Sequence, residues 1–335
     1  MKNNETNISA ENCPSLMVSI IVVTYNQERF IEQTLLSLVN QKTKFDYEII
    51  IGDDFSTDGT RDILVSFENK FSGLIKLNFN EINLGIVGNW NSTIRLSKSK
   101  YIAFCEGDDY WIDNYKLQKQ IDFLESNTNY GMVCTDYNKF FEKDRSIKKN
   151  CFKIEKYAKE VHFLNYVYDR STIATATVVL RRDLFDQYEK EIPETLRIKW
   201  KMPDSPFWLF ILNKSRIAVL PDVTSCYRVN EVSGCRMGDE SSQFWFVFNG
   251  YEIPLYIVKH FSLDNHIKRK LLLVRINYAL EFAFKQDSIE LFNEVLGLDL
   301  PRNKFLIPRY WLFRFGLMNN FSRGITNLVL KLARK

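Results

Sequence analysis

Apolar and polar residues alternate along the first part of the chain in a pattern that predicts strands and helices in turn. Runs rich in apolar and β-branched residues have the length of buried strands, at 17–23, 47–51, 74–80 and 101–105. After each run, apolar residues recur at spacings of three and four, which predicts an amphipathic helix. These helices are expected near 31–39, 60–67, 86–94 and 117–124. Asn26 is the expected N-cap of the first helix.

Strands that alternate with helices predict an α/β fold, with a mostly parallel central sheet flanked by helices on both faces. In sheets of this kind, ligands bind outside the carboxyl ends of the strands. We therefore expect the chemistry in the polar clusters that follow the strands. In this chain those clusters are acidic.

The pattern becomes mixed after residue 130. Further strands are predicted at 131–137, 172–180, 217–220 and 224–229. A helix is expected to open at Ser205-Pro206, with the serine as N-cap. Beyond residue 238 the pattern predicts helices. We therefore expect a disordered lead-in, an α/β domain in two halves and a helical C-terminal region, at 1–16, 17–237 (17–111 and 112–237) and 238–335 respectively.

Composition narrows the class of protein. The 335 residues suggest two structural units, because domains average roughly 150 residues. The net charge of +4 is too small to indicate nucleic acid as a partner. Six cysteines form no C-x-x-C pair and accompany three histidines, which argues against structural zinc and indicates reduced thiols in a cytosolic protein. The polar N-terminus lacks the apolar core of a signal peptide, and no segment reaches the ~18 apolar residues of a spanning helix.

Asp53 and Asp54 follow directly after the second predicted strand. A carboxylate there can accept a hydrogen bond from a base N–H or a ribose hydroxyl. The alternative is a structural role, because residues 53–60 are rich in turn formers. The local sequence leaves both interpretations open.

Glu106, Asp108 and Asp109 stand together at the end of the fourth predicted strand. Carboxylates this close repel one another, and an apolar strand delivers them to the ligand-binding edge. Hard cations take oxygen ligands, and Mg²⁺ is usually held by one or two carboxylates together with substrate phosphates. The cluster therefore predicts a divalent metal site that clamps a diphosphate; the alternative is a solvated acidic turn.

Asp204 stands just before Ser205-Pro206, at the expected start of a helix. A carboxylate there can cap the helix. It can also act as a general base, because the helix N-terminus favours its charged form. Trp111 and Trp208 flank the two acidic segments, and either stack on sugar rings or pack in the core.

Four segments carry a family resemblance through their order and spacing. They are V-S-I-I-V-V-T-Y-N at 18–26, I-I-I-G-D-D-F-S-T-D-G-T at 49–60, N-L-G-I-V-G-N-W-N at 83–91 and E-G-D-D-Y-W at 106–111. Together they resemble the family 2 glycosyltransferases of the GT-A fold. The resemblance covers roughly residues 17–230, and the later P-D-S-P-F-W and S-C-Y-R-V segments are similar to the second half of the family.

The resemblance implies roles for individual residues. Asp108 and Asp109 would belong to the metal and ribose motif, with Glu106 standing where the family often has the first aspartate of that motif. These three side chains would hold a divalent metal, Mg²⁺ or Mn²⁺. Asp204 would be the catalytic base. The residues that would bind the donor nucleotide are Thr24, Tyr25, Asn26, Asp53, Asp54, Asn91 and Asp108.

The resemblance further implies an inverting glycosyltransferase. It would move a sugar from a nucleotide-sugar donor to a hydroxyl of a glycan or lipid-linked glycan in cell-surface polysaccharide assembly. The expected donor is a UDP-sugar, because this family uses UDP-sugars most often. The alternative is a catalytically inactive sugar-nucleotide-binding or scaffold protein of the same fold. A dinucleotide-binding dehydrogenase is disfavoured, because it would carry G-x-G-x-x-G where this chain has T-Y-N-Q-E-R.

Basic and aromatic residues are interleaved at 302–335. A helix of this composition can lie on an anionic membrane surface. One expectation is therefore a cytoplasmic protein with peripheral contact to the inner face of the cell membrane. The other is packing of the segment on the catalytic domain or on a second subunit of a homo-oligomer, and the sequence leaves both open.

Overall fold

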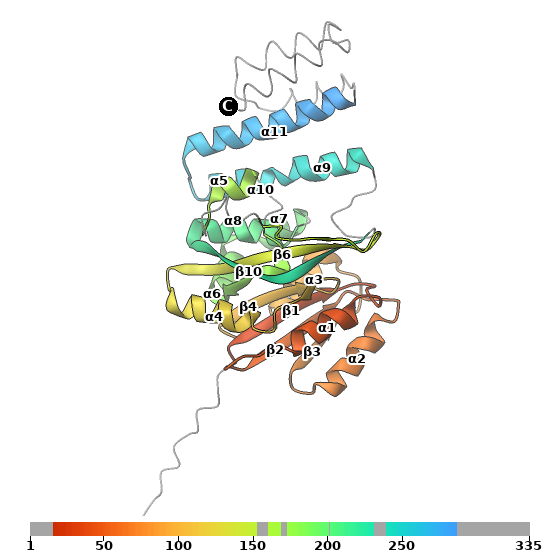
Figure 1. Ribbon diagram of the computed structural model, residues 1–335. Helices are drawn as coiled ribbons and strands as arrows, with labels where there is room; N and C mark the ends of the chain where they lie inside the picture. Colours follow the sequence, from red (N-terminus) through yellow and green to blue (C-terminus); the bar gives the residue numbers. More distant parts are fainter. Residues whose placement is uncertain (1–15, 153–159, 169–172, 201, 231–238, 287–335) are drawn as a thin grey trace, which may run out of the picture. The chain divides into compact units, whose positions relative to one another are not determined.

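The computed structural model describes residues 16–152, 160–168, 173–200, 202–230 and 239–286 (Figure 1). The chain divides into two compact units, Met1–Arg236 and Met237–Lys335. The segment 302–335, and all but the last residue of the predicted lead-in, lie outside the described residues.

The first half of unit 1 alternates strands and helices, as the apolar pattern predicts. The strands are β1 (Val18–Thr24), β2 (Tyr47–Asp53), β3 (Ile75–Phe79) and β4 (Tyr101–Glu106). The helices are α1 (Ile31–Val39), α2 (Thr60–Lys70), α3 (Gly85–Ile94) and α4 (Lys116–Ser126). The strands pair in parallel in the order β3-β2-β1-β4, so their carboxyl ends meet at one edge. We call this the carboxyl edge of the sheet.

The second half of unit 1 extends the same sheet. Its strands are β5 (Tyr110–Trp111), β6 (Tyr130–Phe141), β7 (Ile147–Lys148), β8 (Glu160–Val161), β9 (Val179–Arg181) and β10 (Arg216–Val229). Short β9 lies antiparallel between β4 and β6, and β6 pairs with β10 in parallel. Because two antiparallel pairings in succession restore the direction, β6 and β10 also end at the carboxyl edge.

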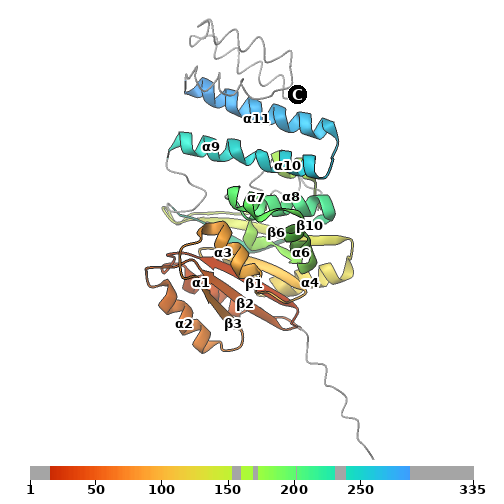
Figure 2. The same cartoon turned by 180° about the vertical axis from the view of Figure 1, so that it is seen from behind.

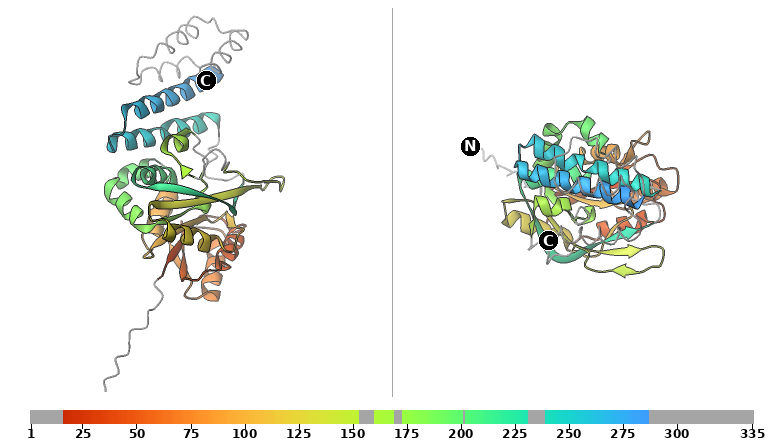
Figure 3. Two further views of the ribbon diagram at one scale, coloured as in Figure 1. Left: turned by 60° about the vertical axis from the view of Figure 1, so that its left-hand side comes forward. Right: turned by 90° about the horizontal axis from the view of Figure 1, so that it is seen from above.

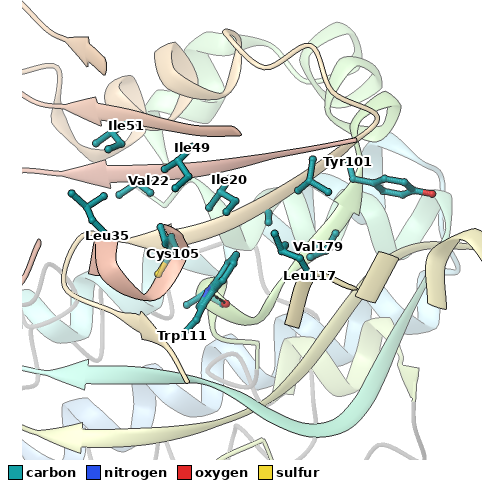
Figure 4. Packing of buried hydrophobic residues seen from close by; sticks show 14 of the residues in the cluster. Ile20, Val22, Leu35, Ile49, Ile51, Tyr101, Cys105, Trp111, Leu117 and Val179 are labelled. Atoms are coloured by element: carbon teal, nitrogen blue, oxygen red, sulfur yellow. Dashed lines mark hydrogen bonds between the residues drawn. The ribbon is translucent and has the colours of Figure 1, made fainter. Parts of the chain in front are cut away.

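Helices cover both faces of the sheet (Figures 1 and 2). On one face, Leu35 of α1 and Leu117 of α4 belong to the apolar cluster shown in Figure 4, together with Ile20, Val22 and Cys105 from the strands. Side chains on both faces of β1 and β4 are buried. This explains why these strands are continuous apolar runs in the sequence.

The opposite face is covered by α3 and by helices from the second half of the unit. These helices are α6 (Arg182–Glu191), α7 (Glu194–Lys199) and α8 (Asp204–Lys214), and α5 (Phe163–Tyr168) packs on α8. Trp90 of α3 stacks on Phe104 of β4 with ring centroids 5.2 Å apart, and Trp208 of α8 meets the same ring at 5.8 Å. Since side chains alternate along a strand, Glu106 points to the same side as Phe104, toward α8.

Two expected helix caps are wrong. Asn26 adopts a positive φ of 51° and its Oδ1 accepts the N–H of Thr57, so it joins two loops, while α1 begins only at Ile31. Helix α8 begins at Asp204, one residue before the predicted N-cap Ser205. There Asp204 Oδ1 accepts the Ser205 N–H at 2.7 Å, so the carboxylate satisfies one of the backbone donors that the first turn of a helix leaves free.

Two predicted strand boundaries also differ. The segment 172–180 contains a short 3₁₀ turn (Thr175–Thr177) before β9, because the Thr177 hydroxyl and N–H both donate to Ala174 O and close a turn. The segments 217–220 and 224–229 form a single strand, β10. Its pairing with β6 shifts register beside Pro221, which has no N–H to donate.

The described part of unit 2 is helical, as predicted for the C-terminal region. It consists of α9 (Glu240–Gly250), α10 (Glu252–His260) and α11 (Asn265–Lys285). Phe244 of α9 and Phe282 of α11 stack with ring centroids 4.1 Å apart. None of the helices that the structure describes combines the length and the apolar character needed to cross a bilayer.

Candidate active site

The acidic turn, residues 106–109, leaves β4 at the carboxyl edge. Gly107 is required at its centre, because a Cβ there would stand 2.3 Å from Gln27 Oε1 and 2.8 Å from Thr24 Oγ1. From α1, the Thr34 hydroxyl donates to the Asp109 carbonyl oxygen at 2.6 Å. The acidic turn is therefore held tightly against β1 and α1.

The carboxyl groups of the acidic turn disfavour one another's charged forms. Burial raises the pKa of Glu106, Asp108 and Asp109, and neighbouring carboxylates raise the pKa of Glu106 and Asp109 further. Two buried oxygens, Glu106 Oε2 and Asp109 Oδ2, have no hydrogen-bond partner among the described residues. The turn is thus a concentrated, incompletely satisfied negative site.

Carboxylate oxygens in such a site fit a hard divalent cation. Among the described residues, no three Asp, Glu, His or Cys side chains converge on one ion position. Mg²⁺ is usually completed by substrate phosphates rather than by an all-protein cage. The acidic turn therefore fits an ion that binds together with a diphosphate.

Two residues at the end of β10 hold the acidic turn in place, and the sequence did not single them out. The Arg228 N–H donates to Asp109 Oδ1 at 2.8 Å, and its Nε donates to the Asp108 carbonyl oxygen at 2.7 Å. Asn230 Nδ2 donates to Asp108 Oδ2 at 3.0 Å. The sequence clue was an arginine within an apolar strand segment, because a buried charge needs partners.

Helix α8 brings Asp204 to the acidic turn. Burial and the charge of Asp108 are the main reasons for the raised pKa of Glu106, and the charge of Asp204 adds to them. The Thr175 hydroxyl donates to Asp204 Oδ2 at 3.4 Å and also hydrogen-bonds Glu106. Burial raises the pKa of Asp204, and the Ser205 N–H opposes that rise. The structure thus unites the predicted base with the predicted metal site, and adds Thr175 between them.

The aspartates after β2 have different partners. Asp53 is fully buried, and its Oδ2 accepts from Arg61 Nε at 2.5 Å. Asp54 Oδ1 accepts from the Leu84 N–H at 2.7 Å and from Asn80 Nδ2 at 3.0 Å. Asp53 therefore anchors α2 to the sheet, whereas Asp54 lies between β2 and the loop that leads into α3.

The end of β1 lies beside Asp54. The Asp54 N–H donates to the Thr24 carbonyl oxygen at 3.0 Å. Thr24 is buried, whereas Tyr25 and Asn26 are exposed, Tyr25 by 47%. The loop after β1 thus offers an exposed aromatic ring, and the residue before that ring is hydrogen-bonded to Asp54.

Asn91 and the two tryptophans lie in buried surroundings. Asn91 Oδ1 accepts from Arg197 Nη1 at 3.3 Å, so the side chain faces α7. Trp111 donates its Nε1–H to the Ala176 carbonyl oxygen, and Trp208 is fully buried. Of the two interpretations for the tryptophans, the structure supports core packing.

The family profile of glycosyl transferase family 2 matches residues 19–189, which contain the acidic turn and the loops after β1 and β2. The chain belongs to this family. The matched segment ends before Asp204 and Arg228, so these residues are placed in the site by the structure rather than by the family match.

Relatives of this family 2 member include proteins named for polysaccharide synthesis. It is 29% identical over 213 residues to an uncharacterized protein of Mycobacterium tuberculosis, covering 63% of this chain and 58% of that protein. It is 28% identical to TuaG of Bacillus subtilis, a putative teichuronic acid biosynthesis glycosyltransferase (70% and 88% covered). It is 29% identical to WfgD of Escherichia coli, a UDP-Glc:α-D-GlcNAc-diphosphoundecaprenol β-1,3-glucosyltransferase (65% and 79% covered). The chain thus spans little more than half the length of the mycobacterial protein.

Solved structures establish the fold of the family 2 member as GT-A. Staphylococcus aureus TarS 1–349 in complex with UDP matches with a TM-score of 0.58 at 23% identity, covering 81% of this chain and 73% of that chain. The mannosyltransferase PcManGT from Pyrobaculum calidifontis, in complex with GDP-Man and Mn²⁺, matches with a TM-score of 0.54 at 15% identity, covering 90% and 85%. The predicted α/β fold of the GT-A type, with a central sheet flanked by helices, is confirmed.

Proposed function

We propose that the chain is an inverting glycosyltransferase that moves a sugar from a UDP-sugar to an acceptor hydroxyl. One observation carries the proposal. The Thr175 hydroxyl hydrogen-bonds both Asp204, from α8, and Glu106, in the acidic turn at the carboxyl edge, so the two carboxyls meet although they are far apart in the sequence. An isolated acidic turn would suit cation binding alone, whereas a separate carboxylate next to it supplies a base for the attacking hydroxyl.

The donor would bind along the ends of β1, β2 and β4. Tyr25 offers a ring for the base to stack on, Asp54 a hydrogen-bond acceptor, and Asp108 a carboxylate for the ribose or the metal. Glu106, Asp108 and Asp109 are the candidate metal ligands, and one or two of these carboxylates would hold the divalent ion together with the phosphates of the donor. When bound, that ion supplies positive charge to the diphosphate that leaves. PcManGT was solved with Mn²⁺ and GDP-Man, which supports this class of ligand.

The reaction would use the residues on the α8 side. Asp204 accepts the proton of the acceptor hydroxyl. At the same time the hydroxyl oxygen forms the new bond to the anomeric carbon, and the bond between that carbon and the diphosphate breaks. Thr175 and the Ser205 N–H hold the carboxylate in position. Because the displacement occurs in one step, an α-linked donor gives a β-linked product.

The names of two relatives support a class of acceptor. WfgD is named for a diphosphoundecaprenol-linked acceptor and TuaG for teichuronic acid synthesis. We therefore propose a glycan or lipid-linked glycan acceptor in cell-surface polysaccharide assembly, with the enzyme in the cytoplasm. Membrane contact or self-association through 302–335 remains part of the proposal, as does Asn91 near the donor pocket.

The proposed function is tested by incubating the full chain with a panel of nucleotide sugars and Mn²⁺ and measuring the free diphosphate released. Turnover with one UDP-sugar well above the others is the expected result. Tight donor binding with no hydrolysis or transfer to any glycan acceptor would instead identify the alternative, a catalytically inactive sugar-nucleotide-binding protein.

Asp54→Asn is expected to weaken donor binding by roughly 10–100-fold, because a hydrogen bond to a charged group contributes about 1.5–3 kcal/mol. Asparagine keeps one oxygen for the Leu84 N–H, so the fold is retained. Calorimetric titration with UDP measures the effect. Asp62→Asn, on the exposed side of α2, is the matched control and should bind UDP normally. An unchanged dissociation constant for Asp54→Asn would remove the base-binding role.

A further inference from the structure

The carboxyl edge carries a projecting β-ribbon that the proposed reaction does not use. We call residues 139–149 the basic arm. In it, β6 pairs with β7, with Lys139 opposite Lys148 and Phe140 opposite Ile147. The turn is closed by the Phe141 N–H, which donates to the Ser146 carbonyl oxygen at 2.9 Å. Figure 3 shows this ribbon extending beyond the rest of the sheet.

The basic arm has five basic residues against two acidic ones, a net charge of +3. Lys143, Arg145, Lys148 and Lys149 are exposed. Lys139 and Lys148 stand directly opposite each other, and like charges in that position destabilise a strand pair. Within the part of the chain that the structure describes, no ion pair joins either lysine to a carboxylate. A bound anion would remove this repulsion.

The other face of the ribbon places apolar side chains among charged ones. Cross-strand partners share a face, so Phe140 and Ile147 lie together, opposite to the lysine pair. Ile147 is 54% exposed, and the Arg145 guanidinium carbon lies 4.8 Å from the Phe140 ring centroid. A large exposed apolar side chain among cations matches a bilayer surface, where headgroups meet acyl chains.

The basic arm is tied directly to the acidic turn. Glu142, in the arm, accepts a hydrogen bond from Arg228 Nη1. The same guanidinium donates through Nε to the Asp108 carbonyl oxygen. Because β6 ends at the carboxyl edge, a surface that binds the arm is held next to the site where the acceptor must enter.

We propose that the basic arm docks on the anionic headgroups of a lipid bilayer. Basic residues near such a surface each contribute about a factor of five in affinity, and the arm offers several at one tip. Docking would present the carboxyl edge to acceptors held in the membrane. That consequence rests on the proposed function, whereas the docking itself does not.

The test is sedimentation of the full chain with vesicles of phosphatidylglycerol and phosphatidylcholine in equal parts, at low salt and without substrate. The variant changes Lys143, Lys148 and Lys149 to Gln, which keeps side-chain length and relieves the lysine pair, so the fold is retained. Roughly 100-fold weaker binding is expected from three lost charges. The matched control changes Lys42, Lys70 and Lys98 to Gln, three exposed lysines at the opposite edge of the sheet, and should bind as the unaltered chain does.

Three outcomes overturn the proposal. The first is unaltered vesicle binding by the arm variant, and the second is an equal loss in the control, which indicates attraction by net charge alone. The third is a loss only on changing Arg309, Arg314 and Arg323 to Gln, which assigns binding to 302–335. Because no substrate is present, failure of the transferase assay leaves this result standing, and turnover of a soluble acceptor by the arm variant should be normal.

Discussion

Asp204→Asn is expected to lower kcat by roughly 10²–10⁴-fold while donor affinity stays nearly unchanged. Asparagine is matched in shape, and its oxygen can still accept the Ser205 N–H that Asp204 Oδ1 accepts at 2.7 Å. What it loses is the ability to take a proton. The measurement is initial rate against donor and acceptor concentration, with UDP affinity by calorimetry.

Two further measurements distinguish a general base from a helix cap at Asp204. Burial raises the pKa of Asp204, so activity of the unaltered enzyme should rise with pH through a value above that of an ordinary aspartate. The Asp204→Asn variant should not show this rise of activity with pH. NMR of the product should show a β linkage from an α-linked donor. Near-normal kcat in Asp204→Asn would exclude the residue as base, and an α-linked product would exclude the single displacement.

Asp109→Asn is expected to lower turnover by roughly 10³-fold or more, and excess EDTA should abolish turnover of the unaltered enzyme. A cation on a diphosphate contributes several kcal/mol to the transition state, and each 1.36 kcal/mol is tenfold in rate. Asparagine is preferable to alanine here, because Asp109 Oδ1 accepts the buried Arg228 N–H. Alanine would leave that donor unsatisfied at a cost of about 1–3 kcal/mol.

The same variant should make the metal-free protein more stable. The folded-state pKa of Asp109 is raised by burial and by Asp108 and Glu106, so its contribution to folding is present at low pH and is lost as pH rises through that pKa. At neutral pH the burial of this carboxyl group is therefore unfavourable without a cation, and asparagine, which does not titrate, removes that cost. A higher melting temperature together with lost turnover is the expected pair of results. Full activity in EDTA would contradict a metal-dependent mechanism.

The proposed site is assembled from both halves of the GT-A unit. The first half supplies the acidic turn and the loops after β1 and β2. The second half supplies Asp204 and Thr175 on the α8 side, and Arg228 and Asn230 at the end of β10. Arg228 contacts both features, since it orients Asp109 and also holds Glu142 at the turn of the basic arm. A substitution there would disturb the acidic turn and the arm together.

The sequence by itself determined the elements of the first half and the edge of the sheet at which their strands end. Strands buried on both faces must be continuous apolar runs, and the acidic residues directly after them must lie at the carboxyl edge. The position of the acidic turn and of Asp54 therefore followed from local pattern. So did the start of α8 near Asp204, to within one residue.

Only the tertiary structure decided which distant residues meet. The bond between Arg228 and Asp109 joins positions 119 residues apart, and the approach of Asp204 to Glu106 depends on how α8 packs beside β4. Periodicity records which side of an element is buried, but not which other element covers it. The expected cap at Asn26 was wrong for the same reason. Its actual partner, Thr57, lies in a loop that only the fold brings near. Local spacing fixes secondary structure and the edge of the sheet, whereas pairing across the fold depends on packing that no short segment of sequence contains.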